Sequence, residues 1–327
     1  MRSITYRRFG PAKEVLSLED SPKPEPQDGE VLVKVKFSGA NPSDVKSRAG
    51  IRPGVTKPPY EKVIPHSDGS GVIEAVGKGV DHSRIAERVW IWNAQWARAF
   101  GTAAEYIALP ADQAVQMPDS MTFENGATLG IPGLTAAHCV FGGGDVRGQT
   151  VLISGGAGAV AHNAIQLAKW GGAKVIATAS PRSFERVSEA GADHVLDYSA
   201  PDLAKQISTI QPNGIDRAVE VEFGPNAELL GRVMRPCGTI SAYGSALEMN
   251  PVFPFGPYLF KAITVDIALV YILEPPQRAN AINKLHEAFA DGALNPAVHE
   301  IYPLEDCIKA HEQIERGGRS GAILLAP

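Results

Sequence analysis

The sequence predicts an α/β protein in two parts, and two observations support that prediction. The first 120 residues contain stretches in which apolar and polar side chains partly alternate, as in half-buried strands, with turn-rich pieces between them. From about Thr122, short apolar runs alternate with segments of helical periodicity. Repeated strand–helix units imply a parallel sheet covered by helices on both faces. We therefore expect a β-rich part followed by a doubly wound parallel sheet.

The individual elements follow from these patterns. Strands of the β-rich part are predicted at 30–37, 71–76 and 88–92. Strands of the parallel sheet are predicted at 149–154, 174–178, 194–197, 216–221, 239–243 and 263–270. Helices are predicted at 162–170, 183–190, 226–234 and, after a proline pair suited to a first turn, 276–290. A strand near Ile301, a helix over 304–314 and a strand over 322–325 are expected to fold back onto the β-rich part. The predicted domains are therefore 1–121 with 271–327, and 122–270.

The composition limits the possible partners. The chain has 327 residues, of which 44% are hydrophobic, and a net charge of −5, which gives no electrostatic reason to expect nucleic acid or an anionic membrane. The longest apolar run, Ile267 to Leu273, is too short to span a bilayer, and no signal peptide is recognisable. The cysteines are odd in number and widely spaced, at 139, 237 and 307. We expect reduced thiols in a cytoplasmic protein.

The segment that follows the predicted 149–154 strand is the most informative in the chain. The run Gly156-Ala157-Gly158-Ala159-Val160-Ala161 fits the pattern G-x-G-x-x-G/A and leads into a predicted helix. In this context, a dinucleotide pyrophosphate binds the free N–H groups of the helix N-terminus, as in a Rossmann domain. We expect Gly156 to permit the tight turn, Gly158 to let phosphate approach, and the small Ala161 to permit close helix packing. The alternative is a glycine-rich turn without a ligand.

The end of the next strand predicts which dinucleotide binds. A ribose with a free 2′-hydroxyl is usually held by Asp or Glu about 20 residues past the loop, but residues 177–183 contain no acid. Ser180 and Arg182 can instead donate hydrogen bonds to a 2′-phosphate. The sequence therefore favours NADPH over NADH. The alternatives are a helix cap for Ser180 and a solvated side chain for Arg182.

Three further segments give the chain a family resemblance. They are Gly39-Ala40-Asn41-Pro42-Ser43-Asp44, the segment from Ser67 to Gly77, and Gly130-Ile131-Pro132-Gly133-Leu134-Thr135-Ala136-Ala137. Taken in order with the glycine loop, they resemble the medium-chain dehydrogenase/reductases, in their zinc-free quinone oxidoreductase (zeta-crystallin-like) branch. The resemblance runs nearly end to end. It implies a GroES-like catalytic domain, a Rossmann domain that binds NADPH, and a homodimer.

The resemblance also bears on metal chemistry. The zinc-dependent relatives have Cys, His and Cys at the positions of Asn41, Ser67 and Ile131. These residues cannot supply the three protein ligands of a catalytic zinc, and His66 is one residue out of register. We therefore expect no metal site and no zinc-dependent alcohol oxidation.

Several cofactor contacts are implied by the resemblance. Asn41 and Thr135 match positions that line the nicotinamide pocket, and Gly158 to Val160 match the pyrophosphate loop. Tyr198 matches a tyrosine that borders the 2′-phosphate, and Gly244 follows a strand at the carboxyl edge, where ligands of such sheets bind. The alternatives are a turn cap for Asn41, a small helix residue for Thr135 and a half-buried loop aromatic for Tyr198.

The chain departs from the family pattern inside the glycine loop. The branch usually has Gly-Gly-Val-Gly where this chain has Gly158-Ala159-Val160-Ala161. If residue 159 required a positive φ, its methyl group would cost about 1 kcal/mol. His162 replaces an apolar residue and is interpreted as a packing or surface residue.

The leading functional hypothesis is an NADPH-dependent, zinc-independent reductase of quinones or α,β-unsaturated carbonyls. No side chain stands out as a dedicated acid, although Tyr60 and Tyr271 are candidates, and a conjugated acceptor needs less acid catalysis than a ketone. Trp92 and Trp96 are candidates for an aromatic cleft, with ordinary core packing as the alternative. One other hypothesis is a nucleotide-binding sensor or crystallin-like protein with little turnover. Another, less favoured, is an alcohol dehydrogenase.

The predicted last strand of the parallel sheet bears on assembly. The segment from Thr264 to Val270 is apolar enough to require a partner if it forms an exposed edge, which agrees with the homodimer that the family implies. The alternative is an edge covered by a helix of the same chain.

Overall fold

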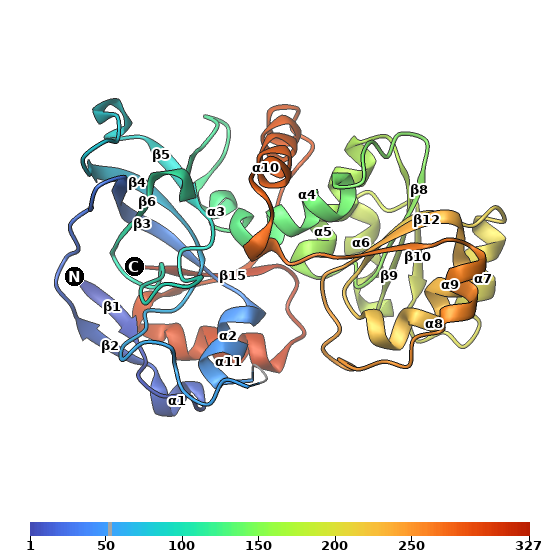
Figure 1. Ribbon diagram of the computed structural model, residues 1–327, viewed down its shortest axis with the longest axis horizontal. Coiled ribbons are helices and arrows are strands. Elements are labelled where there is room, and N and C mark those ends of the chain that lie inside the picture. Colours follow the sequence, from blue (N-terminus) through green and yellow to red (C-terminus); the bar gives the residue numbers. More distant parts are fainter. Residues whose placement is uncertain (52–53) are drawn as a thin grey trace. The chain divides into compact units, whose positions relative to one another are not determined.

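The computed structural model describes residues 1–51 and 54–327, and these residues form two compact units. Unit 1 comprises residues 1–131 and 296–327, and unit 2 comprises residues 132–295. Figure 1 shows the two units, one dominated by an antiparallel sheet and the other by alternating strands and helices. The predicted α/β fold, with a GroES-like sheet and a Rossmann-like parallel sheet, is confirmed.

Unit 2 is a six-stranded sheet of order β10-β9-β8-β11-β12-β13, in which every neighbouring pair is parallel. Its strands are β8 (Thr150–Ile153), β9 (Lys174–Ala179), β10 (His194–Asp197), β11 (Ile215–Glu220), β12 (Met234–Ala242) and β13 (Thr264–Ile267). The chain moves outward from β8 to β10 and returns to β11 on the other side of β8. The carboxyl ends of β8 and β11 therefore form the topological switch point, where ligands of such sheets bind.

Helices and short turns connect the strands of unit 2. They are α4 (Leu134–Phe141), α5 (Ala159–Trp170), η4 (Pro181–Ser183), α6 (Phe184–Glu189), α7 (Leu203–Ile210), α8 (Phe223–Val233), α9 (Phe255–Phe260), η5 (Val270–Ile272) and α10 (Pro275–Ala290). Helices α4, α5 and α10 pack together, whereas α7, α8 and α9 share an apolar cluster with the sheet. Because the sheet is covered by these helices, its central strand β8 is fully buried and almost entirely apolar.

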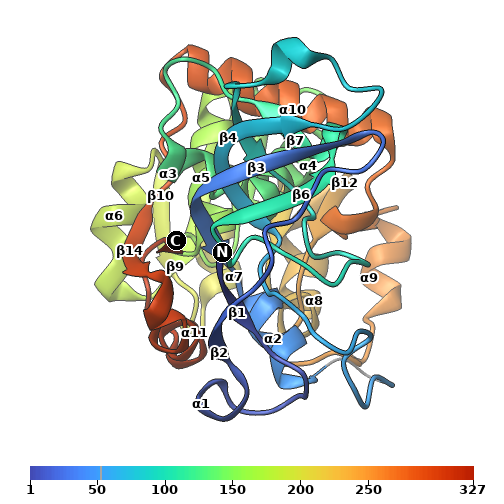
Figure 2. The ribbon, with the colours of Figure 1, turned by 90° about the vertical axis from the view of Figure 1, so that its left-hand side faces the viewer.

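Unit 1 is built on a seven-stranded sheet of order β14-β15-β3-β4-β5-β7, with β6 also paired to β3, and a separate β1–β2 pair. Figure 2 shows this sheet from the side of β3 and β6. The strands are β1 (Arg2–Thr5), β2 (Ser17–Asp20), β3 (Glu30–Ala40), β4 (Asp68–Val76), β5 (Arg88–Ile91), β6 (Tyr106–Pro110), β7 (Ala114–Gln116), β14 (Val298–Pro303) and β15 (Ala322–Ala326). The helical segments are α1 (Ala12–Val15), α2 (Pro42–Ala49), η1 (His82–Arg84), η2 (Ala111–Gln113), α3 (Phe123–Gly126), η6 (Leu304–Asp306) and α11 (Cys307–Arg316).

The C-terminal segment folds back onto the N-terminal sheet, as the sequence predicts. Strand β15 pairs antiparallel with β3, and α11 packs beside α2 and against β15 (Figures 1 and 2). Ile323 and Leu325 of β15 are fully buried in one apolar cluster with Ile4 of β1 and Cys307 of α11. The two ends of the chain therefore build one core.

The division into units differs from the predicted domain boundaries in two segments. Residues 122–131 belong to unit 1, because α3 packs against β3, β4 and β5. Residues 271–295 belong to unit 2, because α10 packs against α4 and α5. The five-residue π-helix η3 (Leu129–Gly133) crosses the boundary. The functional domain limits of 121/122 and 270/271 stay a prediction.

Within residues 1–51 and 54–327, no helix combines the length and the apolar composition needed to cross a bilayer. Cys139, Cys237 and Cys307 are free thiols. The cytoplasmic location expected from the sequence stays a prediction.

Candidate functional site

The glycine loop lies between the end of β8 and the N-terminus of the 12-residue helix α5. The first N–H groups of an α-helix have no partner within the helix and carry the positive end of its dipole. Gly158 is the N-cap residue of α5, and its N–H donates to the carbonyl of Gly155 at 2.9 Å. The first turn of α5 thus presents its N–H donors at the switch point of the sheet, which is the geometry of an anion site.

The structure places the tight turn one residue before the position expected from the sequence. Gly155 has φ +66°, whereas Gly156 is not in the left-handed region. Gly156 is required for packing instead, because a Cβ there would lie 2.9 Å from the side chain of Val187. Ala159 is not among the described non-glycine residues with positive φ, so its methyl group causes no backbone strain. Ala161 is 1% exposed and packs closely, as predicted for a small residue.

A buried carboxylate joins the two strands of the switch point. Glu220, at the end of β11, accepts a hydrogen bond from Ser154 Oγ at 2.7 Å and from the N–H of Glu222 at 2.6 Å. Asn226 Nδ2 donates to the same oxygen at 3.1 Å. Burial raises the pKa of Glu220. Ser154 immediately precedes the glycine loop, so this bond fixes the start of the loop relative to β11.

The other sequence-predicted residues of unit 2 lie near the carboxyl edge of the sheet or in α4. Ser180 and Arg182 follow β9, and the side chain of Arg182 is exposed. Tyr198 follows β10 and is 61% exposed, so it is not the half-buried aromatic of the alternative interpretation. Gly244 follows β12, where a Cβ would lie 2.4 Å from the carbonyl oxygen of Val221. Thr135 is buried in α4.

Arg186 is a candidate that the sequence reasoning missed. It lies on α6, one helical turn after Arg182, and its Nη1 and Nη2 atoms are buried with no hydrogen-bond partner among the described residues. Its positive charge adds to the effect of burial in lowering the pKa of His162, on the first turn of α5, to about 4. A buried guanidinium without an acceptor is costly, so these donors suit an anionic ligand. In the sequence, the i, i+4 spacing of Arg182 and Arg186 was the signal that could have identified Arg186 as a candidate.

In unit 1, Asn41 is held by a carboxylate that the sequence reasoning did not single out. Asp68 Oδ2 accepts hydrogen bonds from Asn41 Nδ2 at 2.8 Å and from the N–H of Ile131 at 3.0 Å. Asn41 is also the N-cap residue of α2, and its N–H donates to Asp44 at 2.8 Å. Asn41 therefore both caps α2, which was the alternative interpretation, and has a side chain whose orientation is fixed by Asp68.

Asp68 is an unusual carboxylate. Its side chain is fully buried, and its Oδ1 atom has no hydrogen-bond partner among the described residues. Burial, with a smaller contribution from Asp44, raises the pKa of Asp68 well above its usual value. Gly130 is required beside it, because a Cβ there would lie 2.2 Å from Asp68 Oδ1. The carboxyl group of Asp68 is thus packed closely against Gly130 and fixes the positions of Asn41 and Ile131.

Tyr60 and Trp92 have structural partners. The hydroxyl of Tyr60 donates to the carbonyl of Ala97 at 2.6 Å, and its ring packs against the apolar cluster of unit 1 that contains Ile4. Trp92 is 9% exposed, and its indole N–H donates to the carbonyl of Asp112 at 3.2 Å. Tyr271 lies half-buried in η5.

Two family models match the chain. The model described as alcohol dehydrogenase GroES-like domain matches residues 27–119, and the model described as zinc-binding dehydrogenase matches residues 159–287.

Proteins of known name align with the chain along its length. A Sus scrofa protein named quinone oxidoreductase is 31% identical over 334 residues, covering 99% of this chain and 98% of its own. A Danio rerio protein named synaptic vesicle membrane protein VAT-1 homolog is 31% identical over 344 residues, covering 99% of this chain and 69% of its own. The solved structure of Escherichia coli quinone oxidoreductase complexed with NADPH is 25% identical, has a TM-score of 0.86 and covers all of both chains.

The chain therefore belongs to the medium-chain dehydrogenase/reductase family, in its quinone oxidoreductase branch, as the sequence motifs predict. By this membership it is an oxidoreductase.

The raised pKa of Asp68 predicts how stability depends on pH. In the folded state Asp68 holds its proton above pH 3.8, where the unfolded chain has lost it. The unfolded state then binds fewer protons, so this residue lowers stability as pH rises toward the folded pKa. An asparagine does not titrate, and its carbonyl oxygen can accept both hydrogen bonds. We expect the stability of Asp68→Asn relative to the wild type to rise with pH.

Urea unfolding of both proteins between pH 4 and pH 9 measures this difference. Asp112→Asn, at an exposed position, is the matched control and should show no such trend. A difference for Asp68→Asn that stays constant or falls with pH would contradict the assignment.

Proposed function

We propose that this protein is an NADPH-dependent oxidoreductase that reduces a quinone or an α,β-unsaturated carbonyl without a catalytic metal. One observation carries the proposal: the glycine loop and the free N-terminus of α5 lie at the switch point, beside a β9 end that has Ser180 and Arg182 and no acid. This combination suits a dinucleotide that carries a 2′-phosphate.

The residues that would hold the cofactor come from several loops. The pyrophosphate would lie against the loop formed by Gly156, Ala157, Gly158, Ala159 and Val160. Its donors would be the first-turn N–H groups of Ala159 and Val160, because those of Gly156 and Gly158 already donate within the fold. The 2′-phosphate would accept hydrogen bonds from Ser180 and Arg182, with Tyr198 at its border and Gly244 on the neighbouring loop. The buried nitrogens of Arg186 would add charge-assisted donors to the phosphate groups.

The reacting end of the cofactor would contact Asn41 and Thr135, as the family resemblance implies. When bound, NADPH supplies a hydride from its nicotinamide ring. Asp68 fixes the orientation of Asn41, because the amide nitrogen of Asn41 is engaged by the carboxyl group. We propose Asn41 and Thr135 as the residues that position the ring, since a well-oriented donor removes much of the entropic barrier. A quinone or enone suits a site without a dedicated acid, because its reduced anion is delocalised.

Asn41, Ser67 and Ile131 do not fit the zinc of the dehydrogenase relatives. At these positions the chain has an amide, a hydroxyl and an aliphatic side chain, where such a zinc needs sulfur, nitrogen or carboxylate ligands. The amide of Asn41 and the backbone N–H of Ile131 both donate to Asp68, so both face a shared acceptor rather than a cation. We therefore propose that hydride transfer here is independent of zinc.

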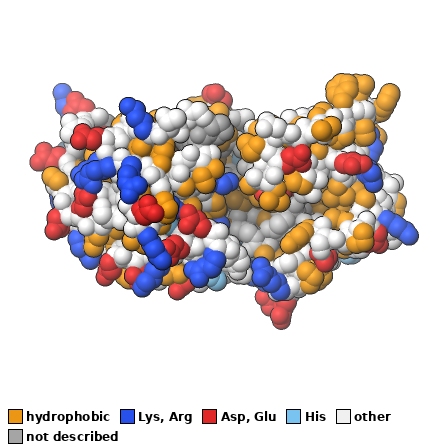
Figure 3. All heavy atoms as spheres, turned by 90° about the horizontal axis from the view of Figure 1, so that it is seen from below, with side chains coloured by type: hydrophobic (Ala, Val, Ile, Leu, Met, Phe, Trp, Pro, Cys, Tyr) orange, Lys and Arg blue, Asp and Glu red, His pale blue; other side chains and the backbone are white. Residues whose placement is uncertain are grey.

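We further propose that the protein is a homodimer that pairs through unit 2. Strand β13 has one neighbour, β12, among the described strands, and Ile267 at its end is 70% exposed, which favours an uncovered edge at this end of the strand. Hydrophobic side chains gather on the surface of unit 2, on the right in Figure 3. Besides Ile267, the most exposed are Leu247, Met249, Val252, Phe255 and Phe260. A second copy of the chain would cover this surface and extend the sheet.

The central test of the function is an acceptor panel. Purified protein should oxidise NADPH with quinones or conjugated enones, and kcat/KM should be at least about tenfold higher with NADPH than with NADH. Added chelator should leave the rate unchanged. Tight NADPH binding without turnover would favour the sensor or crystallin-like alternative. A preference for NADH, or chelator-sensitive oxidation of alcohols, would contradict the proposal.

Arg182→Ala tests the recognition of the 2′-phosphate. Loss of a hydrogen bond to a charged group costs about 1.5–3 kcal/mol, so KM for NADPH should rise about 10- to 100-fold while KM for NADH stays unchanged. Arg232→Ala, on the surface of α8, is the control and should leave both values unchanged. An unchanged KM for NADPH in Arg182→Ala would remove this role.

Ile267→Lys tests the proposed interface. The wild type should sediment as a dimer, and the variant should shift toward monomer because a lysine would be buried against the partner copy. Ile85→Lys, at an exposed position of unit 1, should remain dimeric. A monomeric wild type would overturn the dimer proposal.

A further inference from the structure

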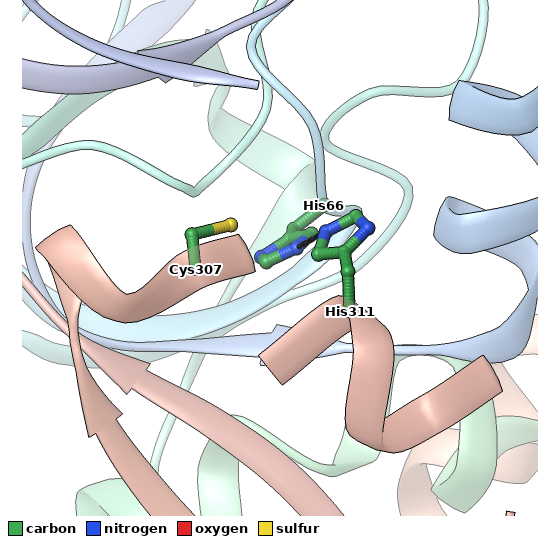
Figure 4. Close-up of side chains that lie close together, drawn as sticks. All are labelled: His66, Cys307 and His311. Carbon is green, nitrogen blue, oxygen red and sulfur yellow. Dashed lines mark hydrogen bonds between the residues drawn. The ribbon is translucent and has the colours of Figure 1, made fainter. Parts of the chain in front are cut away.

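Three donor side chains meet inside unit 1, away from the residues proposed to bind the cofactor. His66 lies on the segment before β4, and Cys307 and His311 lie one turn apart on α11. One donor atom of each, a ring nitrogen or the sulfur, lies within 4.8 Å of the other two. Figure 4 shows the three side chains pointing toward one another. All three are fully buried.

The backbone holds His66 in a specific and strained conformation. Its φ is +77°, in the left-handed region that non-glycine residues rarely adopt. The carbonyl of His66 accepts the N–H of Thr102 at 3.0 Å. Gly101 is required beside it, because a Cβ there would lie 2.1 Å from the carbonyl oxygen of His66. The backbone around His66 therefore fixes the position of its imidazole beside α11.

A chain of hydroxyl groups determines the tautomer of His66. The Thr102 hydroxyl donates to the carbonyl of Asp68, which can only accept. Thr102 must then accept from Ser38 Oγ, 2.8 Å away, and Ser38 must accept from Nδ1–H of His66, also at 2.8 Å. Nε2 of His66 therefore carries a lone pair. A histidine whose Nδ1–H is anchored in this way is prepared to bind a metal through Nε2.

The lone pair of His66 faces a second imidazole. Nε2 of His311 lies 3.0 Å from Nε2 of His66, so without a metal the His311 nitrogen donates its proton across this gap. Nδ1 of His311 is buried and has no hydrogen-bond partner among the described residues. An apolar pair would fill this space without leaving a polar atom unsatisfied. The retained pair and the adjacent thiol form a set of two nitrogen donors and one sulfur donor.

The charge of the surroundings selects the class of ion. Two charged groups act on these side chains: the carboxylate of Asp44 acts on Cys307, and the fully buried Arg48 acts on both Cys307 and His311 with the opposite sign. Arg48 is paired with Glu315. A monovalent ion bound to one thiolate and two neutral imidazoles adds no net charge to this dry core, whereas a divalent ion adds one. Thiolate ligands also favour Cu(I).

We propose that His66, Cys307 and His311 form a three-coordinate site for Cu(I). On binding, the thiol of Cys307 loses its proton to solvent and forms a Cu–S bond, and His311 moves its proton from Nε2 to Nδ1. The oxidation state of copper does not change. The site is separate from the positions 41, 67 and 131 considered for zinc, and its existence does not depend on the proposed NADPH chemistry.

Copper binding is tested in a Cys237→Ser background, which removes the exposed thiol. This protein, purified from copper-supplemented cells and then challenged anaerobically with a chromophoric Cu(I) chelator, should retain one Cu(I) per chain. Adding Cys307→Ser should abolish retention. Adding Cys139→Ser instead, which changes a buried thiol of unit 2, should leave it intact. X-ray absorption should show one sulfur and two imidazole nitrogens around copper in the background protein, a result that requires no site variant.

A second variant tests the hydroxyl chain. Ser38→Ala removes the acceptor of Nδ1–H of His66 and should weaken Cu(I) binding about 10- to 100-fold, as is usual when such a partner is lost. The proposal is overturned if the background protein retains no more Cu(I) than the Cys307→Ser variant, if copper lacks a sulfur ligand, or if the site holds Zn²⁺ in preference to Cu(I). NADPH turnover is measured separately, so failure of either proposal is distinguishable from failure of the other.

Discussion

Asp68 is the residue on which the arrangement of the candidate site in unit 1 depends, through both its buried carboxyl group and its backbone carbonyl. One of its oxygens accepts hydrogen bonds from Asn41, at the end of β3, and from Ile131, the last residue before unit 2 begins in the sequence. Its backbone carbonyl anchors Thr102, and through Ser38 it anchors His66. A carboxyl group is costly to bury, and here its hydrogen bonds fix the positions of Asn41 and Ile131. The carboxyl group of Asp68 thus positions the proposed nicotinamide contact, and its backbone carbonyl, through Thr102 and Ser38, orients the buried imidazole.

The sequence predicts most of unit 2 because its signals are local. Buried parallel strands are continuous apolar runs, and the predicted strand over 194–197 agrees with β10 residue for residue. The boundaries of the units could not be predicted, because the place of α10 depends on its packing against α4 and α5. A helix was expected between the strands that became β10 and β11, but the bounds of α7 (Leu203–Ile210) were not predicted. The positive φ fell on Gly155 rather than Gly156, since a sequence of adjacent glycines does not show which one forms the turn.

In the candidate site, too, residues next to a recognisable strand could be predicted, whereas residues whose role depends on tertiary packing could not. Ser180 and Arg182 follow a recognisable strand, so their place at the carboxyl edge could be predicted. Asp68 and Glu220 were missed, because burial and the pKa shifts that it causes are properties of the folded chain. The proposed copper ligands were also missed, because His66 and α11 are distant in sequence. The i, i+4 spacing of Cys307 and His311 was the available signal, but a helix pair alone is more often part of a core than a site.

The central claim is that the acid-free end of β9 and the free N-terminus of α5 together bind NADPH. The most direct measurement is the crystal structure of the complex with NADPH. We predict that the pyrophosphate lies on the backbone N–H groups of Ala159 and Val160, and that the 2′-phosphate lies within hydrogen-bond distance of Ser180 and Arg182. A cofactor bound elsewhere, or with its 2′-phosphate in solvent and free of both side chains, would contradict it.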